Sequence, residues 1–246
     1  MKKTGKDYVV FPLDFASVKE AKSFVRLLDG HVGVFKIGLE LFISQGPSVV
    51  AMVRDLSRAG IFLDLKLHDI GTTVKRAMAR VADLGVDLVT VHCAGSARML
   101  RMAVAGSQGK TRVLGVTLLT DNDAKTLEAG GFKKTFVQDP QALVLARASM
   151  AQAAGCAGVV CSGREAARIK AALGPEFLAV TPGIRPAWTL LPEDDQKRVT
   201  TPATAVQQGS DLIVIGRPIR DAADPVAAAK KVAAEIDTFL AGPARG

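Results

Sequence analysis

The sequence predicts a single α/β domain over residues 1–246, folded as a (β/α)8 TIM barrel. Its length suits one barrel of ordinary size. Short β-rich runs alternate with amphipathic stretches eight times, and no linker interrupts the series, which favours parallel strands joined by right-handed crossovers. An open doubly wound sheet is the alternative, but Leu13-Asp14-Phe15-Ala16 after the first strand lacks the usual glycine fingerprint.

The expected strands are short apolar runs bounded by polar or glycine-rich segments. They span Tyr8–Leu13, Val32–Ile37, Ile61–Lys66, Leu88–His92, Val113–Leu118, Gly158–Cys161, Phe177–Val180 and Leu212–Ile215. Helical periodicity predicts helices that include Ser17–Leu28, Val74–Leu84, Ala97–Ala105, Pro140–Ala154, Arg164–Leu173 and Pro225–Leu240. The longest irregular stretches, Thr120–Gln138 and Pro182–Thr201, both follow strands and would lie at the C-terminal mouth of a barrel.

The composition narrows the classes of partner. Hydrophobic residues make up 48% and charged residues 23%, as in an ordinary globular protein, and the net charge is +8. Lys and Arg are scattered and aromatic residues make up only 5%, so we expect a solvated basic surface or attraction of an anionic small substrate, and no nucleic acid. With no run of about 18 apolar residues, we also expect no membrane partner.

The cell compartment is predicted from the start of the chain and from its cysteines. The opening MKKTGKDYVVF is too polar for a secretory signal peptide. Cys93, Cys156 and Cys161 form neither a CxxC pair nor an even framework, which fits a reducing compartment. We therefore expect a cytoplasmic protein.

The third expected strand carries charge where a barrel strand should be apolar. In Ile61–Asp69, alternation places Asp64 and Lys66 on one face with Phe62, pointing into the barrel. Ionised groups are costly to bury unless they are paired. A charged pair at the C-terminal end of a barrel strand is typical of a catalytic site.

The first two strands end in the same way. Lys36 lies near the end of the second strand and Asp14 ends the first. Three consecutive strands thus direct two lysines and two aspartates toward one mouth. They form a catalytic group, a structural ion-pair network or a set of solvated strand-end charges.

The last two strands are followed by segments suited to a phosphate. Thr181-Pro182-Gly183-Ile184-Arg185-Pro186 follows the seventh strand, and Gly216-Arg217-Pro218-Ile219 follows the eighth. Barrels often hold phosphate at these two loops and a nearby helix N-terminus. Gly216 would let backbone N–H groups approach the ligand, and Arg185 and Arg217 could donate charge-assisted hydrogen bonds.

No metal site is expected. The three histidines, His31, His68 and His92, have no metal-ligand spacing, and no carboxylate cluster accompanies them.

These residues carry a family resemblance. Asp64-x-Lys66-x-x-Asp69 resembles the signature of the orotidine 5′-phosphate decarboxylase superfamily. Lys36, Thr181–Arg185, Asp195-Gln196-x-Arg198 and Gly216–Ile219 resemble the bacterial decarboxylases of that superfamily, and the resemblance runs from Leu13 to Arg217. It implies removal of the orotate carboxylate to give uridine 5′-phosphate in de novo pyrimidine biosynthesis, without cofactor or metal.

The resemblance also implies roles for single residues. Lys66 would protonate C6 of the pyrimidine, with Asp64 beside the departing carboxylate. Lys36 would orient Asp64 and contact the ribose. Asp69 would enter the neighbouring subunit's site, so the protein would be a homodimer with shared active sites. The remaining substrate contacts would come from Asp14 on the ribose, Thr73 of the partner chain, Thr120 near the pyrimidine, and Arg185, Gln196, Gly216 and Arg217 at the phosphate.

Two segments depart from the family's usual pattern. The chain has Gly71-Thr72 where the family more often has Pro-Asn, and Asp121 where it often has Ser. Two other functions stay open. A 3-keto-L-gulonate 6-phosphate decarboxylase or hexulose-phosphate synthase would need Mg²⁺ and further acidic ligands, whereas the fourth strand ends in Val91-His92-Cys93-Ala94. A non-catalytic phosphate-binding barrel would not need the lysine–aspartate set.

Overall fold

A computed structural model of the chain describes residues 3–189 and 200–242. Its strand order is a closed barrel, β1 to β8 in sequence order, which confirms the predicted (β/α)8 fold. The strands are β1 (Val9–Pro12), β2 (Val34–Ile37), β3 (Gly60–Leu67), β4 (Leu88–His92), β5 (Arg112–Val116), β6 (Gly158–Val160), β7 (Leu178–Pro182) and β8 (Leu212–Val214). The pairs β1–β2, β1–β8, β2–β3, β4–β5, β5–β6 and β6–β7 are all parallel.

Helices occupy most of the chain between the strands. The helices up to β5 are η1 (Gly5–Tyr8), α1 (Val18–Leu28), α2 (Leu39–Gln45), α3 (Ser48–Leu56), α4 (Gly71–Asp83) and α5 (Ala97–Ser107). The later ones are α6 (Ala124–Ala129), α7 (Lys134–Gln138), α8 (Pro140–Ala153), α9 (Ala166–Leu173), η2 (Ala187–Thr189), α10 (Pro202–Gln207), α11 (Arg217–Arg220) and α12 (Pro225–Ala241). No helix of the described part of the chain is long and apolar enough to cross a membrane.

The stretch Thr120–Gln138 is not irregular, as the sequence suggested, because it contains α6 and α7. Asp123 caps α6 by accepting a hydrogen bond from the backbone N–H of Thr126 at 2.8 Å. Such a cap satisfies one of the free N–H groups at a helix start and stabilises a short helix. A helix of this length is too short to show a clear hydrophobic periodicity in the sequence.

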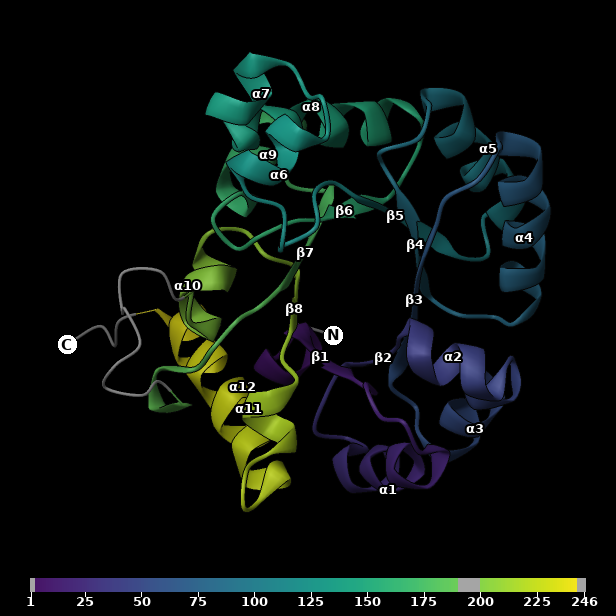
Figure 1. Cartoon of the computed structure of the whole chain (residues 1–246). Coiled ribbons are helices and arrows are strands. Elements are labelled where there is room, and N and C mark those ends of the chain that lie inside the picture. The colour runs from purple at the N-terminus through teal and green to yellow at the C-terminus, as the bar shows by residue number, and fades with distance from the viewer. Residues whose placement is uncertain (1–2, 190–199, 243–246) are drawn as a thin grey trace. The chain divides into compact units, whose positions relative to one another are not determined.

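The chain divides into two compact units, and each is described by itself. Unit 1 comprises Met1–Asp64 and Thr181–Gly246. Its core includes an aromatic cluster in which Phe11 stacks on Phe24 at 5.6 Å between ring centroids and meets Phe35 edge-on at 6.4 Å. Helices α10 and α11 both pack against α12, and Figure 1 shows the three together. The core fixes the strands whose ends carry the first group of candidate residues.

Unit 2 comprises Leu65–Val180. Strands β4 and β5 pair along their whole length, from Leu88 opposite Arg112 to His92 opposite Val116. Helices α4 and α5 pack closely and lie side by side in Figure 1. The unit holds the C-terminal end of β3, and therefore Lys66, next to β4 in the strand order.

Candidate active site

A charged cluster in unit 1 joins one residue each from β2, β3 and the segment just after β1. The Lys36 ammonium donates a hydrogen bond to Asp14 Oδ1 at 2.9 Å and lies 3.7 Å from Asp64 Oδ2. The side chains of Lys36 and Asp64 are 10% and 14% exposed, whereas that of Asp14 is 56% exposed. Burial of a charged lysine is tolerated because two carboxylates surround it. The sequence predicted all three residues, and the structure brings them together.

Gly38 makes room for this cluster. A Cβ atom at Gly38 would lie 2.9 Å from Asp14 Oδ1 and 3.2 Å from the Lys36 Nζ atom. A larger residue would make the Asp14 carboxylate or the Lys36 ammonium shift, so glycine between β2 and α2 serves packing rather than a special backbone angle. The sequence reasoning missed this role, although a glycine two residues after a strand-end lysine was its visible signal.

Lys66, in unit 2, has an unusual backbone. Its φ is 50°, in the left-handed region that non-glycine residues rarely adopt. Its backbone N–H donates a hydrogen bond to the side-chain Oγ1 of Thr90 at 2.8 Å. The prediction that Asp64 and Lys66 share one strand face assumed an extended backbone at both residues. The backbone of Lys66 is not extended, so the regular alternation of faces along β3 ends there.

Two histidines lie near the strand ends of unit 2. The ring centroids of His68 and His92 are 5.5 Å apart, and His92 Nδ1 accepts a hydrogen bond from the Ala94 N–H at 3.2 Å. Burial lowers the pKa of His92, and the charges of His68, Arg147 and Lys66 lower it further. His92 is therefore neutral at pH 7, with its proton on Nε2.

Arg147 of α8 is a second feature that the sequence reasoning missed. Its Nη1 donates to the Thr117 carbonyl at 2.6 Å, and its guanidinium lies 5.4 Å from the Phe132 ring centroid. Burial lowers the pKa of Arg147. One α8 side chain thus connects the end of β5 to the segment that carries α6 and α7, and no signal in the sequence marks that contact.

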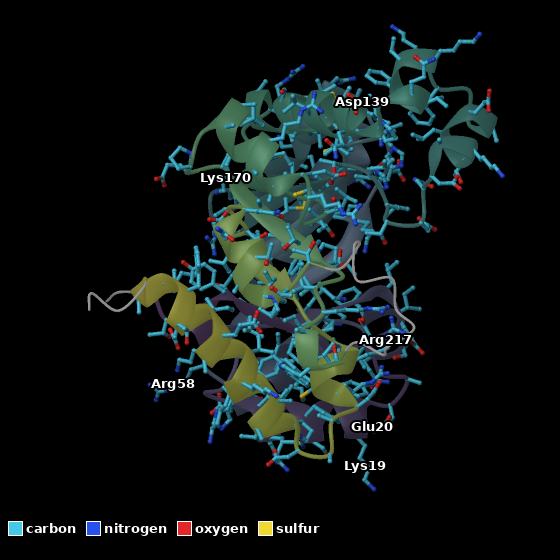
Figure 2. The ribbon with its side chains drawn as sticks, turned by 90° about the vertical axis from the view of Figure 1, so that its left-hand side faces the viewer. Lys19, Glu20, Arg58, Asp139, Lys170 and Arg217 are labelled. Atoms are coloured by element: carbon cyan, nitrogen blue, oxygen red, sulfur yellow. The ribbon has the colours of Figure 1, made fainter. Side chains whose placement is uncertain are left out.

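The predicted phosphate segment after β8 lies beside the first cluster in unit 1. Gly216 is the N-cap of α11, and a Cβ there would lie 3.0 Å from Pro12 Cγ. Pro12 is paired with Lys36 in the β1–β2 register. Arg217 begins α11 and is exposed. Figure 2 shows Arg217 and Glu20 on the same side of unit 1.

Arg220, the last residue of α11, is paired with its neighbour Asp221. Its Nε donates to Asp221 Oδ1 at 2.6 Å. That hydrogen bond raises the pKa of Arg220, and the charges of Asp14 and Glu20 also raise it.

The segment after β7 is only partly described. Thr181 is buried and donates a hydrogen bond to Ser210 Oγ at 3.0 Å. Arg185 is exposed, and its backbone N–H donates to the Thr200 carbonyl at 3.1 Å. Gln196, the other residue predicted here, lies outside the described residues.

The remaining predicted residues lie at the surface of unit 2. Asp69 is exposed, and its Oδ1 accepts a hydrogen bond from the Ile70 N–H at 2.6 Å. Thr73 lies in the first turn of α4 and Thr120 in a turn after β5, and both are exposed. No described contact joins these three residues to one another.

Within residues 3–189 and 200–242, no group of three or more His, Cys, Asp and Glu side chains could hold a metal ion. Two of the three cysteines are unsuited to nucleophilic catalysis, because burial raises the pKa of Cys93 and that of Cys156 to about 12.

Comparisons with known proteins find related sequences over nearly the whole chain. The model of the orotidine 5′-phosphate decarboxylase / HUMPS family matches residues 7–232. A protein from Desulfosudis oleivorans named orotidine 5′-phosphate decarboxylase is 46% identical, over 96% of this chain and 95% of that protein. A protein of the same name from Anaeromyxobacter dehalogenans is 48% identical, over 91% and 96%.

Solved structures show the same similarity. The crystal structure of orotidine 5′-phosphate decarboxylase from Lactobacillus acidophilus has a TM-score of 0.79 and 33% identity, covering 94% of this chain and 99% of that one. An uncharacterized conserved protein from Geobacillus kaustophilus has a TM-score of 0.78 and 36% identity, covering 93% and 99%. These likenesses extend over nearly the whole length of each chain.

Proposed function

We propose that this chain converts orotidine 5′-phosphate to uridine 5′-phosphate and CO2 in de novo pyrimidine biosynthesis. The chain is an enzyme and belongs to the orotidine 5′-phosphate decarboxylase / HUMPS family. The observation that carries the proposal is the buried Lys36 between Asp14 and Asp64, with Lys66 two residues further along β3. The reaction needs fixed charges and a proton donor, and this part of the sequence supplies both without a cofactor.

The chemical step assigns one role to each charged residue. Loss of CO2 from C6 leaves an electron pair on that carbon, which the Lys66 ammonium stabilises and then protonates. The neutral amine regains its proton from water. Asp64 lies beside the departing carboxylate, and Lys36 holds Asp64 in place through the 3.7 Å ion pair. Asp14 takes the ribose hydroxyls, which its exposed carboxylate favours.

A second carboxylate is needed on the other side of Lys66, and we assign it to Asp69 of the partner subunit. The sequence Lys36, Asp64, Lys66, Asp69 would then alternate cations and anions, so that each charge is balanced. Asp69 is exposed in the single chain, as a residue that serves another subunit must be.

Exposed apolar side chains support the homodimer. Leu39 and Ile43 lie one helical turn apart on α2 and are 47% and 77% exposed. In unit 2, Ile70, next to Asp69, is 71% exposed. Large exposed apolar residues near functional residues are typical of surfaces that a second subunit covers. Thr73, in the first turn of α4, would reach the partner's site with Asp69.

The phosphate is assigned to the segment that begins at Gly216. At the start of α11 the phosphate could accept from the backbone N–H groups of Gly216 and Arg217, since Pro218 has none and the Ile219 N–H donates to the Gly216 carbonyl. The Arg217 side chain adds a cation there. Arg185 and Gln196 would complete the phosphate contacts, and Thr120 would contact the pyrimidine. We also propose that residues 1–246 act as one catalytic domain in the cytoplasm, where three free buried cysteines are expected.

The proposed function predicts that the metal-free protein is active. After exhaustive treatment with EDTA, addition of orotidine 5′-phosphate should cause loss of the orotate absorbance at the same rate as before treatment. The physical reason is that Lys66 supplies the positive charge that a metal would otherwise provide. The product should co-elute with uridine 5′-phosphate on ion-exchange chromatography.

The same experiment separates the alternatives. Activity that disappears with EDTA and returns with Mg²⁺ would favour a sugar-phosphate lyase of the family, and 3-keto-L-gulonate 6-phosphate is then the substrate to assay. Binding of uridine 5′-phosphate without turnover of any of these substrates would leave a phosphate-binding barrel.

Arg217→Ala should mainly weaken substrate binding. We expect kcat/KM for orotidine 5′-phosphate to fall roughly 10- to 150-fold, since a hydrogen bond to a charged group contributes about 1.5–3 kcal/mol. Orotidine, which lacks the phosphate, should react slowly with both proteins and lose almost nothing on substitution. Steady-state kinetics with the two substrates measures the difference.

Arg220→Ala is the matched control, because Arg220 lies on the same helix but is paired with Asp221. It should leave both substrates within about twofold of the unsubstituted protein. An equal penalty from Arg217→Ala on orotidine and on orotidine 5′-phosphate would contradict the phosphate contact.

A further inference from the structure

The backbone of Lys66 is out of place in a strand. Within the described ranges, Lys66 and Gln108 are the two non-glycine residues with positive φ, at 50° and 54°. Gln108 has an ordinary reason, because it is the left-handed C-cap of α5. Lys66 lies inside β3, where no helix ends, and the left-handed region costs a non-glycine residue about 1–2 kcal/mol. Backbone held in such a region points to a functional constraint.

Thr90 is the residue that meets this backbone. It lies in the middle of β4 and is fully buried. Alternation along β4 places Leu88, Thr90 and His92 on one face, opposite to Val89 and Val91. In a regular parallel ladder a strand N–H donates to a backbone carbonyl of its neighbour, but the Lys66 N–H donates to the Thr90 hydroxyl oxygen at 2.8 Å.

We infer that Thr90 is a positioning residue for Lys66, holding its backbone in the left-handed conformation that aims the ammonium at the reacting carbon. The inference rests on the proposed function, because it concerns the lysine to which the proton transfer is assigned. Thr90 acts through Lys66 and needs no contact with substrate.

The physical reason is the acceptor's position. A side-chain oxygen stands away from the strand axis, so an N–H that bonds to it turns out of the regular ladder. If that oxygen is lost, the Lys66 N–H is left inside the protein without this acceptor, and the extended conformation becomes favourable again. The Lys66 side chain would then extend from the backbone in a different direction. Small misplacements of a reacting group slow the chemical step greatly.

Three substitutions isolate the oxygen atom. Thr90→Val keeps the shape of the side chain and removes the hydroxyl. Thr90→Ser and Thr90→Ala both lose the methyl group, and only Thr90→Ser keeps the acceptor. Thr111→Val is the matched control. Thr111 lies just before β5, is also buried in unit 2, and donates a hydrogen bond from its hydroxyl to the Val86 carbonyl at 2.9 Å.

The expected result is a loss of kcat without a matching change in KM. Thr90→Val and Thr90→Ala should lower kcat roughly 10- to 100-fold, with KM within about threefold, while Thr90→Ser stays within about threefold of the unsubstituted protein. Amide hydrogen exchange at Lys66, followed by NMR, should accelerate roughly three- to tenfold in Thr90→Val and Thr90→Ala and be restored in Thr90→Ser. Thr111→Val should lower thermal stability and leave both readouts unchanged.

Other outcomes overturn the inference. Unchanged kcat in Thr90→Val, or equal losses in Thr90→Ser and Thr90→Ala, would show that the hydroxyl does not position Lys66. If Thr90→Val does not fold, the comparison of Thr90→Ser with Thr90→Ala decides alone. Failure of the proposed function would be seen separately, as an unsubstituted protein that does not decarboxylate orotidine 5′-phosphate. In that case the rate of amide hydrogen exchange at Lys66 still tests the hydrogen bond to Thr90.

Discussion

Replacing Lys66 by alanine is expected to lower kcat for orotidine 5′-phosphate by roughly ten-thousandfold. General acid catalysis contributes about 10²–10⁴ in rate, and the same ammonium also stabilises the developing negative charge at C6. The substitution removes both contributions. Single-turnover measurement of orotate absorbance gives the rate of the chemical step, free of product release.

Lys66→Arg separates the two contributions. An arginine keeps the positive charge but does not give up its proton at accessible pH. We expect it to bind uridine 5′-phosphate and still to lose most of the activity. Lys22→Ala, at an exposed lysine of α1, should be without effect. A Lys66→Ala protein that keeps more than about one hundredth of the activity would contradict the assignment of the proton donor.

Mixing two inactive proteins is expected to restore activity if Asp69 serves the partner's site. Lys66→Ala and Asp69→Ala should each be severely impaired as homodimers. After the two are unfolded and refolded together in equal amounts, half of the dimers contain one chain of each kind. In such a dimer one site carries both lesions, and the other takes Lys66 from one chain and Asp69 from the other, so it is intact.

About a quarter of all sites should therefore be intact after random pairing. Activity approaching that fraction of the unsubstituted protein, with mixed dimers confirmed by native mass spectrometry, is the expected measurement. As a control, mixing Lys66→Ala with Asp64→Ala should restore nothing, since both residues would then belong to the same chain's site. Mixed dimers without activity in the Lys66–Asp69 experiment would place Asp69 in its own subunit's site and contradict the alternating array.

The sequence by itself determined the barrel and its family. Each β/α unit is a local pattern, and eight such patterns in a row leave few topologies open. The lysines and aspartates could be found in the same way, because an ionised residue within an apolar strand stands out against its neighbours. The prediction that Thr120–Gln138 is irregular was wrong, because this stretch contains α6 and α7. Helices this short leave too little hydrophobic periodicity in the sequence to detect.

Only the tertiary structure decided how these residues meet. The Asp14–Lys36–Asp64 distances depend on the strand register, and the space at Gly38 depends on how β2 continues into α2. Likewise, the left-handed φ of Lys66 accompanies a hydrogen bond to Thr90, a residue 24 positions away in the sequence. Periodicity reports which face of an element a residue occupies, whereas a backbone angle and a hydrogen-bond partner are set by the neighbouring strand against which that element packs.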